Sequence, residues 1–295
     1  MRSRRESRER WFYLLAAPWL IGLVLLQAVP MAGAALLSLT DWQPPLPAQW
    51  VGLDNFYGLL GDARFIRAAG NTVVYGIGTV VPGLALGLGL ALLLRGIRRG
   101  GSLLQATVFM PAVVSGVATA LMWGWIFNPR FGLLNGALDA VGIQGPAWLR
   151  DPSWAMPAMI LMGLWNVGIN VVVYLAALNS VPRELHEAAA LDGAGHSARF
   201  RHVTWPALTP ITLYLAVVNA IGAFQVFTPT YLLTGGGPDD ATLTTSLYTY
   251  QIAFATGRLG YASAATLIVF VVVLLLTVAL FRFLGRRVQY LGAES

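Results

Sequence analysis

Six long apolar runs dominate the hydrophobic pattern of this chain, and each is long enough to cross a bilayer as a helix. A membrane-spanning helix needs about 20 mostly apolar residues, and none of these runs contains Asp, Glu, Arg, Lys or His. The pattern therefore predicts an all-α membrane protein with six spans, which we place near Phe12–Leu37, Thr72–Leu94, Leu103–Phe127, Trp154–Leu178, Leu208–Leu233 and Leu259–Phe281.

The arginines are unevenly divided between the two sides of these predicted spans. With a cytoplasmic N-terminus, 14 of the 19 arginines fall in cytoplasmic segments. Because positive residues accumulate on that side of membrane proteins, both termini are predicted to be inside. We therefore expect a cytoplasmic N-terminal tail (1–11), a six-helix transmembrane domain (12–284) with a cytoplasmic loop at 179–207, and a cytoplasmic C-terminal tail (285–295) in a multi-pass protein of the cell membrane.

The composition agrees with a membrane protein and excludes some kinds of catalytic and metal site. Hydrophobic residues make up 57% of the chain and charged residues only 11%, with a mean hydropathy of +0.65, whereas a soluble domain carries about 25% charged residues. Cysteine is absent, which excludes thiol catalysis and cysteine-ligated metals. Every basic residue is arginine, so the chain lacks the lysine that a P-loop needs. The net charge of +6 follows from the arginine topology, and we expect no nucleic-acid partner and no cofactor in this chain.

The predicted spans contain neutral polar side chains in place of charges. Asn166 and Asn170 lie four residues apart in the fourth span, and Asn219 and Gln225 lie in the fifth. Amides that face lipid would be costly, so these should face other helices or a cavity. Two interpretations remain open: hydrogen bonds between helices, or an uncharged lining for a hydroxyl-rich solute such as a sugar. Because ion-coupled carriers usually bury ionisable residues, the energy for any active transport should come from another polypeptide.

The segment 179–207 is a charged interruption of the apolar pattern. It predicts a short helix that opens at Ser180 or Val181 and ends at Gly193 or Gly195, and a second short helix that stops before Pro206. The two helices would form a helix–turn–helix that lies along the membrane surface. Its length and position favour docking of a partner protein.

A metal or catalytic site is the main alternative for this segment. HEAAA at 186–190 begins like the H-E-x-x-H of zinc peptidases, but Ala190 occupies the second histidine position. The spacings between His186, His196 and His202 match no common metal site. We therefore expect no metal and no catalytic residue there.

The same segment resembles the signature of a known family. Glu187, Ala188 and Ala189 are followed after three residues by Gly193, and V-T-W-P follows after nine further residues at 203–206. Membrane subunits of binding-protein-dependent ABC importers carry such an EAA loop, with I-x-L-P in place of V-T-W-P. Other segments resemble the carbohydrate-uptake permeases of the maltose and glycerol-3-phosphate type: GLDNF at 52–56, GNT at 70–72, FMPAVVSGVA at 109–118, IFNPRFGLLN at 126–135 and TGGGPDDAT at 234–242.

This resemblance implies the type I ABC importer permease fold and the import of a sugar or polyol across the inner membrane. It implies three kinds of partner: a second, similar permease chain, two ATP-binding cassette ATPase subunits that hold ATP and Mg²⁺, and an extracellular solute-binding protein. It assigns ATPase docking to Glu187, Ala188, Ala189, Asp192 and Gly193. A stand-alone facilitator or channel, whose loop binds a regulator, is the alternative that the charge-free spans also allow.

Overall fold

The regular structure of this chain is helical throughout the part that the structure describes. The computed structural model describes residues 2–97 and 100–285, so all but the first residue of the predicted C-terminal tail lies outside the described part. Two compact units are formed: unit 1 comprises Met1–Asp62 and Thr249–Ile268, and unit 2 comprises Ala63–Tyr248 and Val269–Ser295. The prediction of an all-α chain is confirmed for the described residues, whereas the cytoplasmic placement of the termini stays a prediction.

Unit 1 begins with a long helical run that a π-helical turn interrupts. α1 (Arg2–Leu23), η1 (Val24–Ala28) and α2 (Val29–Leu37) follow one another with helical backbone angles at both junctions. Pro30 lies in the first turn of α2 and has no N–H to donate, and the π-helical turn directly before it absorbs the resulting change in the hydrogen-bond ladder. Most of the predicted N-terminal tail is therefore helical and continues into the first span.

The loop after α2 is held by Asn55, in the first turn of α3 (Asp54–Gly61). Its buried side-chain amide donates to the carbonyl oxygens of Ser38 and Thr40, at 2.8 Å in each case. The GLDNF segment thus has a structural role. α3 ends at Gly61 because Asp62 has an extended backbone.

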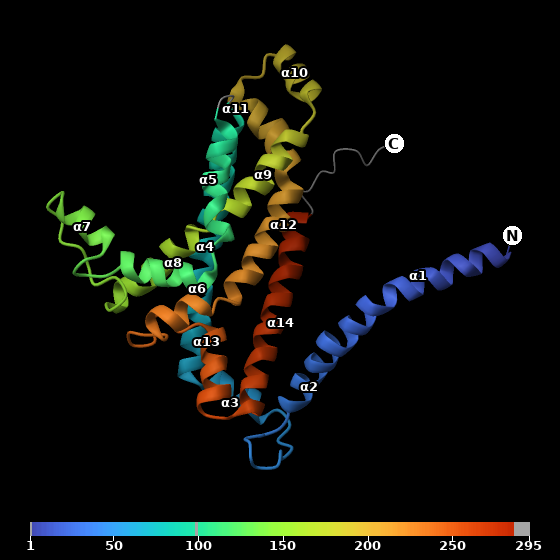
Figure 1. The fold of residues 1–295 in the computed structure, drawn as a ribbon, viewed down its shortest axis with the longest axis vertical. Coiled ribbons are helices and arrows are strands. Elements are labelled where there is room, and N and C mark those ends of the chain that lie inside the picture. Colours follow the sequence, from blue (N-terminus) through green and yellow to red (C-terminus); the bar gives the residue numbers. More distant parts are fainter. Residues whose placement is uncertain (1, 98–99, 286–295) are drawn as a thin grey trace. The chain divides into compact units, whose positions relative to one another are not determined.

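Unit 2 is built around the 33-residue helix α4 (Ala63–Arg95). α8 (Pro152–Leu164), α9 (Gly168–Ser180) and α12 (Trp205–Phe224) pack against it, as Figure 1 shows. The remaining elements of the chain are α5 (Gly101–Val113), α6 (Gly116–Ile126), α7 (Leu133–Asp139), α10 (Arg183–Leu191), α11 (His196–Arg199), η2 (Phe200–Thr204), η3 (Thr230–Thr234), α13 (Thr245–Tyr250), η4 (Gln251–Ala255) and α14 (Leu259–Leu284).

Five of the six apolar segments are helical where they were predicted, although two of these five are bent. Four runs are long and apolar enough to cross a membrane as they stand: Tyr13–Leu37, Ala63–Arg95, His196–Phe224 and Leu259–Phe283. The predicted third span consists of α5 and α6, at 98° to each other, and the fourth consists of α8 and α9, bent by 43°. Up to six spans result if each bent pair crosses once.

Local backbone conformation explains both bends. Val114 and Ser115 are extended and separate α5 from α6. A turn at 165–167 separates α8 from α9. Asn166 therefore lies in this turn, whereas the sequence predicted it on one helical face with Asn170.

The predicted fifth span is displaced toward the N-terminus. A continuous helix runs through α11, η2 and α12, and it ends at Phe224 rather than at Leu233. The prediction of a second loop helix that stops before Pro206 is wrong. Pro206 occupies the first turn of α12, and the π-helical turn η2 lies directly before it, in the same arrangement as η1 and Pro30.

Two glycines allow α4 and α9 to approach closely. A Cβ atom added at Gly87 would lie 2.7 Å from the Cβ of Asn170, and one added at Gly83 would be in ordinary contact with the Asn170 side chain. This close approach explains the small-xxx-small spacing of the two glycines. Beyond them the main core of unit 2 is apolar and contains Ala91, Leu94, Val171, Tyr174, Leu175, Leu178, Leu208 and Leu215.

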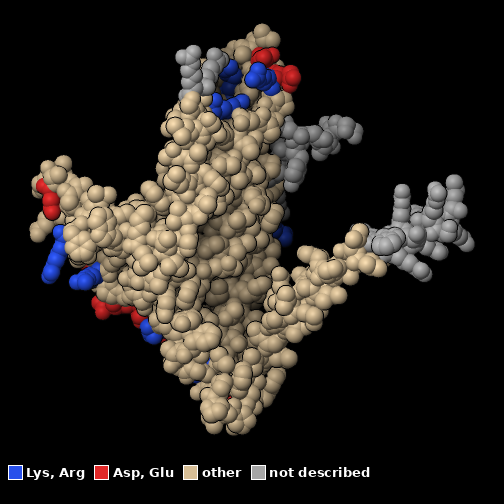
Figure 2. Space-filling model, in the orientation of Figure 1, with Lys and Arg blue, Asp and Glu red and all other residues tan. Residues whose placement is uncertain are grey.

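Charged side chains of unit 2 gather in two places in the view of Figure 2. One group covers α10 and α11, and another lies around α7. Apart from one basic spot at the right edge, the surface of the long helices between them is free of charge in this view. This distribution is the one expected of a unit whose middle lies in lipid.

Candidate functional site

The helix α10 is a separate short element at one end of unit 2 (Figure 1). It begins at Arg183, slightly later than predicted, because Val181 and Pro182 have extended backbone. Gly193 ends it with a φ angle of +78°. The N–H of Gly193 donates to Ala190 and that of Ala194 to Ala189, which are the two hydrogen bonds of a Schellman cap.

The glycine left undecided by the sequence is thereby identified as Gly193. Gly195 has a φ angle of −69° and instead precedes the first residue of α11. A left-handed φ is costly for residues with a Cβ atom, so only position 193 requires glycine for its backbone. The turn between α10 and α11 depends on this residue.

One face of α10 is apolar and exposed, and the exposed side chains of Glu184 and Glu187 flank it. Leu191 is 89% exposed and Leu185 is 37% exposed, and Ala188 between them is also exposed. Ala189 is half-buried and contributes only in part to this face. The sequence reasoning missed Leu191, although it continues the spacing of three residues from Leu185 through Ala188. Leu185, Ala188 and Leu191 are exposed together on one face, and contiguous apolar surface of this kind is typical of protein-binding sites.

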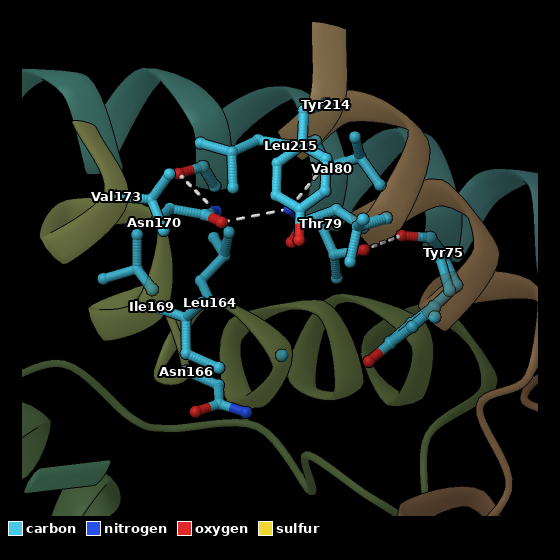
Figure 3. Close-up of a pocket in the computed structure, with 17 residues that line it drawn as sticks. Tyr75, Thr79, Val80, Leu164, Asn166, Ile169, Asn170, Val173, Tyr214 and Leu215 are labelled. Carbon is cyan, nitrogen blue, oxygen red and sulfur yellow. Dashed lines mark hydrogen bonds between the residues drawn. The ribbon is translucent and has the colours of Figure 1, made fainter. Parts of the chain in front are cut away.

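A cavity of about 350 Å³ with apolar and uncharged polar side chains in its wall lies between α4, the α8–α9 turn and α12. Three of the four predicted pathway amides line it, namely Asn166, Asn170 and Asn219. The fourth, Gln225, is exposed at the end of α12 and does not line the cavity. Figure 3 shows further polar groups on its wall that the sequence reasoning did not single out, from Tyr75, Thr79 and Tyr214.

Hydrogen bonds between helices use two of these amides. Asn170 donates to the carbonyl oxygen of Gly83 at 3.3 Å, and its own oxygen accepts from the Asn219 amide at 3.0 Å. Asn219 also donates to the carbonyl oxygen of Leu215. Asn166 is exposed, and its side chain has no hydrogen-bond partner among the described residues. In Figure 3 its amide points away from the bonded pair. The cavity thus combines a structural network with one free amide.

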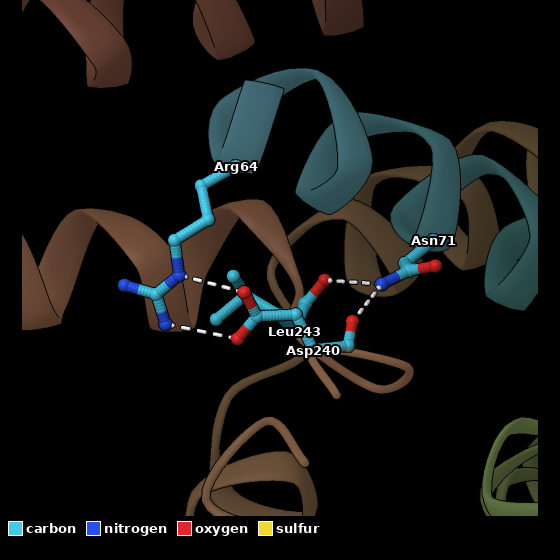
Figure 4. Close-up of polar contacts among 4 residues, drawn as sticks. All are labelled: Arg64, Asn71, Asp240 and Leu243. Carbon is cyan, nitrogen blue, oxygen red and sulfur yellow. Dashed lines mark hydrogen bonds and ion pairs between the residues drawn. The ribbon is translucent and has the colours of Figure 1, made fainter. Parts of the chain in front are cut away.

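At the other end of α4, two motifs that are far apart in the sequence are joined. The amide of Asn71, in the GNT segment, donates to the carbonyl oxygens of Asp240 (2.7 Å) and Leu243 (3.0 Å), 169 and 172 residues away. The hydroxyl of Thr72 accepts a hydrogen bond from the N–H of Thr245. These bonds, most of which Figure 4 shows, tie the TGGGPDDAT segment to α4.

An ion pair strengthens this junction. Arg64 donates from Nε and from a terminal nitrogen to the two carboxylate oxygens of Asp240, at 2.7 and 2.9 Å. These hydrogen bonds hold the pKa of the Asp240 carboxyl below its ordinary value. Asp240 has a φ angle of +54°, which is unusual for a residue other than glycine. Its side chain and its carbonyl oxygen are both held, which maintains this conformation.

Comparison with known proteins places these features in a family. The family described as "Binding-protein-dependent transport system inner membrane component" matches residues 65–290. The probable ABC transporter permease protein YesP of Bacillus subtilis (strain 168) is 35% identical over 288 residues, which are 96% of this chain and 93% of that protein. The sn-glycerol-3-phosphate transport system permease protein UgpA of Escherichia coli (strain UTI89 / UPEC) is 34% identical over 294 residues, covering 98% and 99%.

A solved structure agrees with the fold. A chain in the crystal structure of a bacterial alginate ABC transporter, in complex with an alginate pentasaccharide-bound periplasmic protein, superimposes with a TM-score of 0.84. The match covers 96% of both chains, with 25% sequence identity. The helical arrangement is therefore that of an ABC importer permease.

Proposed function

This chain belongs to the binding-protein-dependent transport system inner membrane component family, and on that premise we propose that it is the permease subunit of an ATP-driven importer for a sugar or related polyol. The observation that carries the proposal is α10: a separate helix with the EAA residues and an exposed apolar face that includes Leu191. The relatives are ABC transporter permeases, which favours an importer over a stand-alone facilitator.

The connections of α10 support its role as the coupling helix. On one side it follows α9 after two extended residues, and on the other it is joined through Gly193 to the continuous helix of α11, η2 and α12. α9 carries Asn170 and α12 carries Asn219, and both residues line the cavity. A force on α10 would therefore reach the two helices that shape the cavity wall. An ATPase that binds Glu187, Ala188, Ala189, Asp192, Gly193 and Leu191 would apply such a force.

The cavity wall suits an uncharged, hydroxyl-rich solute. Its polar groups are amides and hydroxyls, and no charged side chain lines it. Asn166 is the first candidate for a substrate contact because its amide is free of partners among the described residues. Asn170 and Asn219 present their remaining hydrogen-bonding capacity to the same space. Gln225, which is exposed outside the cavity, could contribute only from a surface shared with another chain.

The remaining partners complete the proposal. A second permease chain would cover the exposed apolar helices, two ATPase subunits would bind ATP and Mg²⁺, and an extracellular binding protein would deliver the solute. The protein is a multi-pass component of the inner membrane, and α10 lies on its cytoplasmic side according to the arginine distribution.

Co-purification tests the docking surface directly. We expect Leu191→Asp to lose the ATPase from the purified complex and to abolish binding-protein-stimulated ATP hydrolysis in proteoliposomes. Val141→Asp is a control, since Val141 is 70% exposed but lies in the segment after α7, away from α10 in the sequence. Normal ATPase recovery with Leu191→Asp would refute the docking proposal. The sugar is then identified by uptake with the cognate binding protein.

A further inference from the structure

A second cavity, of about 340 Å³, lies on the inner side of α10. Its walls come from three segments: the end of α4 with Arg95, α10 with Arg183, His186 and Glu187, and α11 with Arg199. Three arginines thus face one glutamate around a single hollow, and the lining carries a net charge of +2 when the histidine is neutral. Leu191 does not line this cavity, whereas Glu187, which also belongs to the proposed ATPase-docking residues, forms part of its wall.

The basic groups of this cavity lack anionic partners in the described part of the chain. None of its three arginines forms an ion pair or a side-chain hydrogen bond with a described residue. Moreover, Nε of Arg199 and Nε2 of His186 are buried atoms without a hydrogen-bond partner among those residues. Buried nitrogens are rarely left unpaired. Three unpaired guanidinium groups, one of them with a buried nitrogen, and the buried imidazole nitrogen indicate that a ligand with several acceptor oxygens belongs here.

The protonation of His186 is compatible with such a ligand. Burial, and then the charges of Arg95 and Arg199, lower the pKa of His186. The ring is therefore neutral at neutral pH, and Nε2 can carry the single proton and donate it. A neutral donor adds a hydrogen bond without adding to the repulsion among the cations. Together with guanidinium groups it matches a phosphate, whose several oxygens each accept hydrogen bonds.

The position of the cations decides the source of the phosphate. Arg95 is the last residue of the span Ala63–Arg95, and Arg199 lies in the first turn of the run His196–Phe224. The ends of membrane-spanning helices lie at the level of the lipid headgroups, where basic pockets on the cytoplasmic side attract anionic lipids. We propose that this cavity binds the phosphate group of an anionic phospholipid.

Lipid binding by the purified complex tests this assignment. The complex is reconstituted in nanodiscs of equimolar phosphatidylglycerol and phosphatidylcholine, and the lipids that stay bound after detergent extraction are quantified by mass spectrometry. Native complex should retain phosphatidylglycerol in preference to phosphatidylcholine. Arg199→Gln should lower this preference about fivefold, which corresponds to about 1 kcal/mol for one arginine at an anionic surface. Arg201→Gln removes the same charge from the neighbouring turn but not from the cavity, and it should leave the preference unchanged.

Each other outcome overturns the proposal. If both variants lose the preference for phosphatidylglycerol equally, the overall positive charge attracts the lipid. If both variants keep the preference, the cavity does not bind the lipid. Calorimetric binding of inorganic phosphate by the delipidated complex, without any lipid preference, would assign the site to a free anion. Loss of the ATPase from Arg199→Gln with lipid retention unchanged would assign it to an acidic side chain of that partner.

A second variant and a readout independent of transport separate this test from the test of sugar import. Arg95→Gln repeats the test from a different helix if Arg199→Gln does not assemble. The measured quantity is bound lipid rather than transport, so a failed test of sugar import leaves the outcome of this experiment unaffected.

Discussion

The substitution Gly87→Ala tests the packing of α4 against α9. The added Cβ would lie 2.7 Å from the Cβ of Asn170 and 3.4 Å from its carbonyl carbon, whereas carbon atoms in contact are normally about 3.5–4.0 Å apart. Both obstructing atoms are fixed to the α9 backbone, so no change of rotamer relieves the clash. The two helices must therefore separate by about 1 Å.

The cost of this separation follows from two terms. Overpacking a well-filled contact costs about 1–3 kcal/mol. The hydrogen bond from Asn170 to Gly83, already 3.3 Å long, would be lost, and such bonds in membrane proteins contribute on average about 0.6 kcal/mol. We expect a destabilisation of about 2 kcal/mol, which for a unit of this size lowers the midpoint of thermal unfolding by about 4–8 °C.

The assay is thermal unfolding of the detergent-purified complex, followed by fluorescence-detected size-exclusion chromatography. Gly89→Ala is the matched control, because it lies on the same helix and its added Cβ would meet nothing within 4 Å. The control should unfold at the native temperature or up to about 4 °C above it, because alanine in a helix is more favourable than glycine by about 0.5–1 kcal/mol. If Gly87→Ala unfolds at the same temperature as Gly89→Ala, the inference that α4 and α9 are in close contact at Gly87 is refuted.

The remaining predictions concern the coupling turn, the cavity and the outer junction. Gly193→Val should cost about 1–2 kcal/mol through its positive φ and reduce ATPase co-purification, whereas Gly195→Val should not; equal recovery with both would contradict the assigned turn. Asn166→Ala should lower sugar uptake with an unchanged unfolding midpoint, and Asn170→Ala should lower the midpoint as well. A lowered midpoint for Asn166→Ala alone would contradict the structural role given to Asn170. The pKa of Asp240 is depressed in the folded chain, so its stabilisation is present at neutral pH and is lost as the pH falls through the ordinary aspartate pKa towards the depressed value. Limited proteolysis of the segment 234–245 should therefore accelerate in acid. The Asp240→Asn variant should be cleaved rapidly at every pH, so its cleavage should not accelerate further in acid.

Much of this protein can be predicted from the sequence because the relevant signals are local. Membrane insertion depends on the summed transfer free energy of about 20 consecutive residues, so the apolar runs locate the helices. The EAA spacing and the glycines after it predict α10 and its cap, since a helix end depends on a few neighbouring residues. The absence of lysine and cysteine directly excludes a P-loop, thiol catalysis and cysteine-ligated metals in this chain.

Contacts between distant segments required the folded chain. Asn170 could have faced a solute or another helix, and only the closeness of α4 and α12 shows that it bonds Gly83 and Asn219. The joining of Asn71 to Asp240 across 169 residues leaves no periodic signal in either segment. The choice between Gly193 and Gly195 depended on a single φ angle. The bends at 114–115 and 165–167 lie within apolar runs, where hydropathy is the same for a straight helix and a broken one. In each case the deciding energy comes from a partner far along the chain or from backbone geometry, and neither is encoded in the local composition.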